Sequence, residues 1–269
     1  MRSEIGAYYD RGAENGRLSA GAGRLEFLRT WDVLTRVLPA APASVLDVGG
    51  ATGVYATPLA RAGYQVHVVD PVAAHVAESA TVPGVTAEVG DARALTVADA
   101  SVDAVLLLGP LYHLTERSER LTVWREAARV VRPGGVVVAA TISRFASLLD
   151  GFVRGFLAEP RFLGIVREDV ATGQHRNPDD VPHWFTTAYF HHPGEPPAEA
   201  AEEGLDVDRV VAVEGPLWMV GTLPEFLADG ERTRLTLDLL REVESEPSLH
   251  GASSHLLTVA HRPQVTGGS

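Results

Sequence analysis

A run of small residues between a predicted strand and a predicted helix is the first feature of the sequence that could bind a ligand. Residues 45–55, VLDVGGATGVY, are typical of a buried strand ending near Asp47, then a glycine-rich turn and a helix beginning near Tyr55. Such a turn lets a ligand approach the backbone, and the helix N-terminus offers free N–H groups to an anion. The same pattern also suits a tight turn without a ligand. The residues at the ends of the neighbouring strands are therefore needed to distinguish the two interpretations.

Carboxylates follow the next two predicted strands. Asp70 ends VHVVD at 66–70, and Asp91 lies in GDA at the end of the strand at 86–91. In a doubly wound sheet these strand ends meet at one edge, where a carboxylate can bind ribose hydroxyls or an adenine amino group. Each aspartate alone would also suit a helix N-cap. Three such features on consecutive strands favour a nucleoside-containing ligand.

The ordered motifs DVGGATG, VVD, GDA, VDAVLLLGPLYHL and RPGG resemble those of class I S-adenosylmethionine-dependent methyltransferases. The likeness is closest to the small-molecule group that includes the ubiquinone and menaquinone biosynthesis type. It covers residues 40–143 and extends more loosely to a late antiparallel pair within 207–262. The implied cofactor is S-adenosylmethionine. A nicotinamide dehydrogenase would require G-x-G-x-x-G, which this turn fits poorly.

The resemblance implies cofactor contacts at the ends of four strands. The expected contacts are Gly49, Ala51 and Gly53 with the methionine part, Asp70 with the ribose, Pro71 and Val72 with the adenine face, Asp91 and Ala92 with the adenine edge, and the Leu108 carbonyl with the methionine amino group. Ala51 stands where the family has its middle glycine, and its methyl group is small enough for us to expect the turn to tolerate it.

Further cofactor contacts are expected near the N-terminus. Tyr8 lies in AYYDRG, a segment that often folds over the cofactor in the resembled family. Arg24 and Arg29 could bind the methionine carboxylate, since a guanidinium can hold it with two hydrogen bonds. An exposed helix face is the alternative for either arginine.

The methyl acceptor is expected beside GPLYHL, residues 109–114, which follows the fourth strand. Methyl transfer is an in-line displacement, so the protein must align the acceptor with the methyl group and exclude water. Tyr112 and His113 are the predicted catalytic residues, because a histidine titrates near working pH and can remove a proton. Equally, His113 could bond a loop while Tyr112 packs on the cofactor.

Elements that alternate between apolar strands and amphipathic helices must position these residues. They predict an α/β fold, a Rossmann-like doubly wound and mostly parallel sheet with an antiparallel last strand. The predicted strands are 45–49, 66–70, 86–91, 102–109, 135–143, 207–215 and 254–262, and the predicted helices are 24–38, 55–63, 116–131 and about 223–245.

The regular alternation of predicted strands and helices ends after Ser143, which suggests how the chain is divided. The predicted parts are N-terminal helices and a cofactor-binding core at 1–143, a helical and loop lid at 144–200, completion of the sheet at 201–263 and a tail at 264–269. Histidines and aromatics gather at 175–192 without metal-ligand spacing. They favour an aromatic pocket wall or a packing patch over a metal site, and no metal is expected.

Composition narrows the class of protein. The 269 residues carry 35 acidic against 23 basic side chains, a net charge of −12, and contain no cysteine. This balance disfavours nucleic acid and anionic membranes as partners, and it excludes disulfides and thiolate chemistry. Polar N-terminal residues and short apolar runs favour a cytoplasmic protein, and the alanine, glycine, valine and arginine content favours a bacterial source.

The function expected is methyl transfer to an oxygen or nitrogen, less readily a carbon, of a small-molecule acceptor by a monomer or homodimer. A protein that binds the cofactor without turnover is one alternative. A protein or RNA methyltransferase is the other, although GPLY stands where base-directed enzymes carry N/D-P-P-Y/F.

Overall fold

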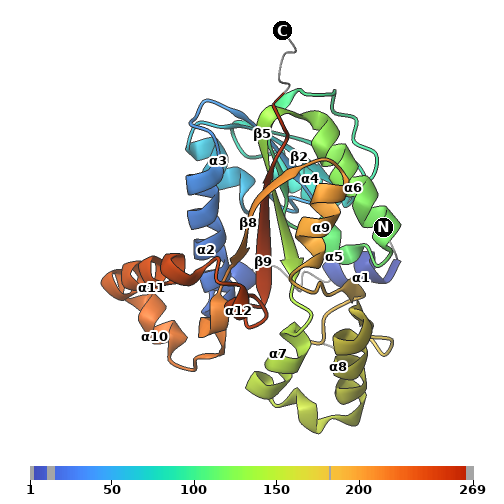
Figure 1. The fold of residues 1–269 in the computed structure, drawn as a ribbon, viewed down its shortest axis with the longest axis vertical. Helices are drawn as coiled ribbons and strands as arrows, with labels where there is room; N and C mark the ends of the chain where they lie inside the picture. The colour runs from blue at the N-terminus through green and yellow to red at the C-terminus, as the bar shows by residue number, and fades with distance from the viewer. Residues whose placement is uncertain (1–2, 11–15, 182, 265–269) are drawn as a thin grey trace.

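The computed structural model describes residues 3–10, 16–181 and 183–264, and across them the chain forms one seven-stranded sheet covered by helices on both faces (Figure 1). The strand order is β3-β2-β1-β4-β5-β9-β8. The strands are β1 (Ser44–Val48), β2 (Gln65–Asp70), β3 (Val85–Val89), β4 (Val102–Leu107), β5 (Val131–Ile142), β8 (Asp206–Ala212) and β9 (His255–His261).

The sheet confirms the predicted Rossmann-like architecture. β1 to β5 run parallel, and β9 lies antiparallel between β5 and β8. The central strands are rich in β-branched residues and buried on both faces, which is the pattern of a parallel sheet sandwiched between helices. The carboxyl ends of β1 to β5 therefore share one edge.

Two apolar clusters join the helices to the sheet. On one face α2 (Gly21–Val37) and α3 (Ala56–Arg61) contribute to one cluster, and on the other α6 (Arg117–Val130) and α9 (Glu195–Glu202) contribute to the second. The remaining elements are α1 (Ser3–Asp10), α4 (Ala73–Ser79), α5 (Pro110–His113), α7 (Ala146–Arg154), α8 (Pro160–Thr172), α10 (Leu223–Ala228), α11 (Gly230–Val243), α12 (Pro247–His250), η1 (Arg17–Ser19), η2 (Phe156–Ala158), η3 (Gly215–Met219), β6 (Gln174–His175) and β7 (Ala188–Tyr189).

The segment predicted as a lid forms α7, η2 and α8, which project beyond the sheet in Figure 1, and the short β6–β7 pair. Of the predicted tail, residues 265–269 lie outside the described part of the chain. No helix in the described ranges combines the length and apolar character needed to cross a membrane.

The long helix predicted at 223–245 is instead two helices, α10 and α11. Asp229 separates them, and its side chain accepts a hydrogen bond from the Arg232 N–H at 2.8 Å. Aspartate is among the best N-cap residues, so it favours the start of a new helix over continuation of the old one. The two helices pack against α2, which the single-helix prediction could not show.

Arg29 on α2 is part of a buried ion-pair network. Its side chain is fully buried and donates to Asp32 at 2.7 Å, to Glu244 at 2.6 Å and to the Val213 carbonyl at 3.1 Å. Burial favours a higher pKa for both carboxyls, but the surrounding arginines outweigh it and lower both pKa values. The expectation that Arg29 reaches a ligand is therefore corrected, because each of its nitrogens is engaged within the fold.

Replacing Arg29 by alanine should destabilise the protein by about 3 kcal/mol, because two buried carboxylates lose a partner. Arg36 contacts the same two carboxylates but is about one-third exposed, so Arg36→Ala is the matched control, with an expected loss of about 1 kcal/mol. Urea unfolding of the three proteins measures both values. Equal losses would contradict the structural role assigned to Arg29.

Candidate active site

A cavity of about 1130 Å³ opens at the carboxyl edge of the sheet. It begins beside Asp91 after β3, passes over the turn after β1, and continues across β5 to His255 at the start of β9. Ligand pockets commonly hold between about 300 and 1000 Å³. This cavity therefore has room for two ligands side by side.

The glycine-rich turn after β1 forms the floor of the cavity. Gly49 has a φ of 73°, and a β-carbon there would lie 3.1 Å from Pro110 Cδ, so the position favours glycine. Ala51 also has a positive φ, 48°, which costs a non-glycine residue about 1 kcal/mol or more. The Ala51 N–H donates to Asp70 Oδ2 at 3.0 Å, which holds this conformation.

Asp70 connects three segments at the end of β2. It is 4% exposed, and besides Ala51 its carboxylate accepts the Val72 N–H at 2.9 Å and lies 3.2 Å from His75 Nδ1. Asp70 is not the N-cap considered from the sequence, because α4 begins after Val72 and has no side-chain cap. Asp70 also lines the cavity, so the same carboxylate can accept hydrogen bonds from a ligand.

Asp47 is a site residue that the sequence analysis noted only as a strand end. It lines the cavity at 1% exposure, and neither carboxylate oxygen has a hydrogen-bond partner among the described residues. Burial, with the nearby charge of Asp70, raises the pKa of Asp47 to about 7. A buried carboxylate without a partner favours binding of a cationic group.

Asp91 lines the adjacent wall, but its carboxylate is already occupied. Arg93 donates to it from Nε at 2.9 Å, from Nη2 at 2.6 Å and from its backbone N–H at 2.9 Å. These bonds lower the pKa of Asp91 to about 2. Arg93 therefore competes with any ligand amino group for this carboxylate.

Most of the remaining predicted site residues also line the cavity. These are Gly49, Ala51, Pro71, Val72, Ala92, Leu108, Tyr112, His113 and Arg24. Gly53, Tyr8 and Arg29 are not among the lining residues. Gly53 belongs to the turn, with its N–H donating to the Gly50 carbonyl at 2.9 Å, and the Tyr8 ring lies edge-on to Phe185 at 5.5 Å.

Tyr112 and His113 form an aromatic wall at the end of β4. The Tyr112 hydroxyl donates to the Leu108 carbonyl at 3.3 Å, and the His113 ring stacks on Phe185 with 5.9 Å between centroids. Phe185 comes from the segment predicted as a lid. Neither Phe185 nor any other described residue of that segment is among the residues that line the cavity. Phe185 instead packs with Phe190 and Tyr112 in an apolar cluster, which fits the packing patch considered as the alternative.

The profile of the methyltransferase domain matches residues 46–139, from β1 through most of β5. These residues therefore carry a methyltransferase domain. Assignment to the quinone-biosynthesis subgroup stays a prediction. The uncharacterized methyltransferase Rv3342 of Mycobacterium tuberculosis is 35% identical over 134 residues, 49% of this chain and 48% of that protein. The chain thus matches about half the length of the curated relative.

Solved structures share the fold. A SAM-dependent methyltransferase from Methanosarcina mazei aligns with a TM-score of 0.58 at 17% identity, over 86% of this chain and 97% of that one. A second structure is the complex between the Haloferax volcanii Trm112 methyltransferase activator and a methyltransferase. One of its chains aligns with a TM-score of 0.62 at 19% identity, over 98% of this chain and 100% of that one.

S-adenosylmethionine is the cofactor that the resemblance implies, and residues lining the cavity fit that molecule. The molecule carries an ammonium group and a ribose diol. Asp47 offers a buried carboxylate without a described partner, and Asp70 offers lone pairs at the ribose position expected from the resemblance.

Replacing Asp47 by asparagine should change the pH dependence of stability. The folded-state pKa of about 7 lies above the ordinary value of 3.8, so the unfolded chain ionises first as pH rises from 4 to 7. Stability of the ligand-free native protein therefore falls across this window. Relative to it, Asp47→Asn should gain about 3 kcal/mol between pH 4.5 and 7.5. Urea unfolding at both pH values measures this, and a pH-independent difference would contradict it.

Proposed function

We propose that the protein transfers a methyl group from S-adenosylmethionine to an oxygen or nitrogen of a small-molecule acceptor. The observation that carries the proposal is the pair of buried carboxylates, Asp47 and Asp70, beneath one cavity at the glycine-rich turn. Transfer to carbon is the less favoured form. When bound, the cofactor supplies a methyl group on a positively charged sulfur.

The cofactor end of the cavity lies between Asp91 and Leu108. In this proposal Asp70 binds the ribose hydroxyls, while Asp47 binds the methionine ammonium group and gains a cationic partner. Pro71 and Ala92 contact the adenine. Charge-assisted hydrogen bonds to buried carboxylates are the strong ones, so they would dominate cofactor affinity.

The acceptor end lies beyond Tyr112 and His113. These two side chains would position the acceptor against the methyl group, while the Phe185 segment helps to exclude water. A small molecule is favoured because the cavity is larger than one ordinary ligand needs and the chain is strongly acidic. The Haloferax volcanii methyltransferase forms a complex with an activator protein, and that property is known for that protein alone. For this chain, a protein or RNA substrate is the second candidate.

Calorimetric titration tests the cofactor assignment. The protein should bind S-adenosylmethionine in the micromolar range and should not bind NADH. Asp70→Ala should weaken binding by about 2 kcal/mol, roughly thirtyfold, because it removes charge-assisted hydrogen bonds. Asp208→Ala, on an exposed part of β8, is the matched control and should leave affinity unchanged. Absence of binding by the native protein would refute the proposal.

Replacing His113 by alanine distinguishes a role in positioning the acceptor from a role in stabilising the fold. Turnover, measured as release of S-adenosylhomocysteine, should fall about tenfold or more because the acceptor loses a wall beside the methyl group. Calorimetric affinity for S-adenosylmethionine should stay within about twofold of that of the native protein. Equal losses in turnover and affinity would show that His113 is structural. Cofactor binding without turnover on any acceptor would favour the non-catalytic alternative.

A further inference from the structure

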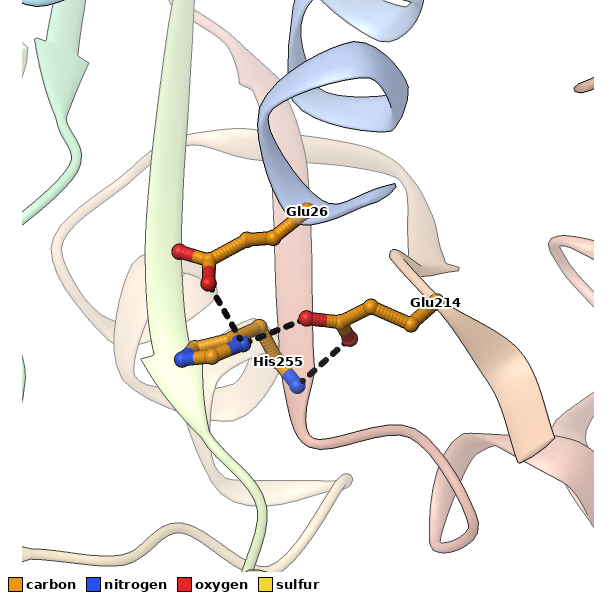
Figure 2. A group of neighbouring side chains, drawn as sticks. All are labelled: Glu26, Glu214 and His255. Atoms are coloured by element: carbon orange, nitrogen blue, oxygen red, sulfur yellow. Dashed lines mark hydrogen bonds and ion pairs between the residues drawn. The ribbon is translucent and has the colours of Figure 1, made fainter. Parts of the chain in front are cut away.

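A second group of ionisable side chains, drawn in Figure 2, includes two residues that line the same cavity, Glu26 and His255. It consists of Glu26 from α2, Glu214 just after β8 and His255 at the start of β9. His255 Nδ1 lies 2.6 Å from Glu214 Oε1 and 3.6 Å from Glu26 Oε2. These residues are outside the domain match at 46–139.

Glu214 is held rigidly. It is 2% exposed, and its Oε2 accepts hydrogen bonds from the His255 backbone N–H at 3.0 Å and the Ser253 hydroxyl at 2.9 Å. Its pKa is lowered, because the contacts with His255 and Ser253 outweigh the effect of burial. Glu214 is therefore ionised and accepts the Nδ1 hydrogen of His255.

This contact determines the protonation pattern of His255. With the hydrogen on Nδ1, the neutral ring carries its lone pair on Nε2. Figure 2 shows Nε2 on the side of the ring away from Glu214, and no hydrogen bond joins it to a described residue. His255 lines the cavity, so this basic nitrogen is available to a ligand.

The position of His255 relative to the cofactor end follows from the sheet. His255 pairs with Ile142 of β5, and β5 pairs with β4, which leads to Leu108. Two strand spacings of about 4.8 Å separate β4 from β9, and the register sets His255 two residues, about 7 Å, further along the sheet than Leu108, so about 12 Å lies between their backbones. That span accommodates an acceptor about the size of one ring between the methyl group and His255.

The charges around His255 make it a stronger base. Burial favours a lower pKa for the ring, but Glu26 and Glu214 outweigh it, so the pKa of His255 is raised. Arg17 opposes this slightly and forms an ion pair with Glu26, with Nη2 2.9 Å from Oε1. Both carboxylates thus already face a cationic or hydrogen-bonding partner, which disfavours a metal ion at this cluster.

We propose that the Glu214–His255 pair is the general base of the methyl transfer and that the acceptor is a hydroxyl compound; this rests on the function proposed above. A bond forms between the acceptor oxygen and the methyl carbon as the carbon–sulfur bond breaks, leaving its electron pair on sulfur. The hydroxyl proton goes to Nε2 of His255 and then to solvent. Glu214 is a positioning residue, and His113 remains part of the wall.

The pair can be tested without any ligand. NMR of protein labelled with ¹⁵N-histidine should show His255 with its hydrogen on Nδ1 and with a pKa above the ordinary 6.5. Glu214→Gln should lower that pKa, whereas the signal of His261, at the other end of β9, should not move. A hydrogen on Nε2, or no change on removing the Glu214 charge, would overturn the proposal even if Glu214→Gln also loosens the fold.

Turnover of two phenols tests the base directly. At pH 8, 4-methylphenol keeps its proton, while 4-nitrophenol is largely ionised and needs no base. His255→Asn keeps a donor for Glu214 but lacks Nε2, and should lower kcat for 4-methylphenol about 100-fold with little effect on 4-nitrophenol. With 4-methylphenol the native rate should rise with pH through the His255 pKa. His261→Asn is the matched control and should match the native protein.

The other outcomes separate the two proposals. Equal losses on both phenols, or methylation of neither by the native protein, would overturn the base and the hydroxyl acceptor while leaving the function standing if S-adenosylmethionine still binds. Failure of the native protein to bind S-adenosylmethionine would instead refute the function. Loss of turnover in EDTA with recovery in Mg²⁺ or Mn²⁺ would make the cluster a metal site and overturn the base.

Discussion

The hydrogen bond from the Ala51 N–H to Asp70 is the interaction on which the candidate site depends. It connects the turn after β1 to the end of β2 and holds Ala51 at a positive φ that its side chain disfavours. Through Val72, the same carboxylate also shapes the next loop. One buried side chain, that of Asp70, thereby holds both the turn that forms the floor of the cavity and the loop that forms one wall.

The other buried carboxylates show how structural charges differ from functional ones. Glu244 has Arg29 and Arg36, and Glu199 has Arg120, so each burial cost is offset inside the fold. Asp47 has no such partner among the described residues. This contrast is why we assign Asp47 to a cationic ligand, whereas the Arg29 network serves to dock α2 and the chain after α11.

The sequence predicted the features that depend on local pattern. Apolar, β-branched runs predicted the strands, and their order brought Asp70 and the glycine-rich turn to one edge. The sequence could not predict which side chains pair when they lie far apart along the chain. Arg29 was expected at a ligand because nothing local indicates Glu244 as its partner. The Glu214–His255 pair depends on β8 lying beside β9, and the division of α10 from α11 depends on a single cap at Asp229.

A crystal structure with S-adenosylhomocysteine would test the central claim most directly, namely that one cavity holds the cofactor at one end and the acceptor at the other. The account predicts that the adenine lies beside Ala92, that the ribose is bonded to Asp70 and the ammonium group to Asp47, and that the sulfur faces the side of the cavity where His255 lies. A ligand bound elsewhere, or reversed so that its sulfur lies beside Ala92, would contradict it.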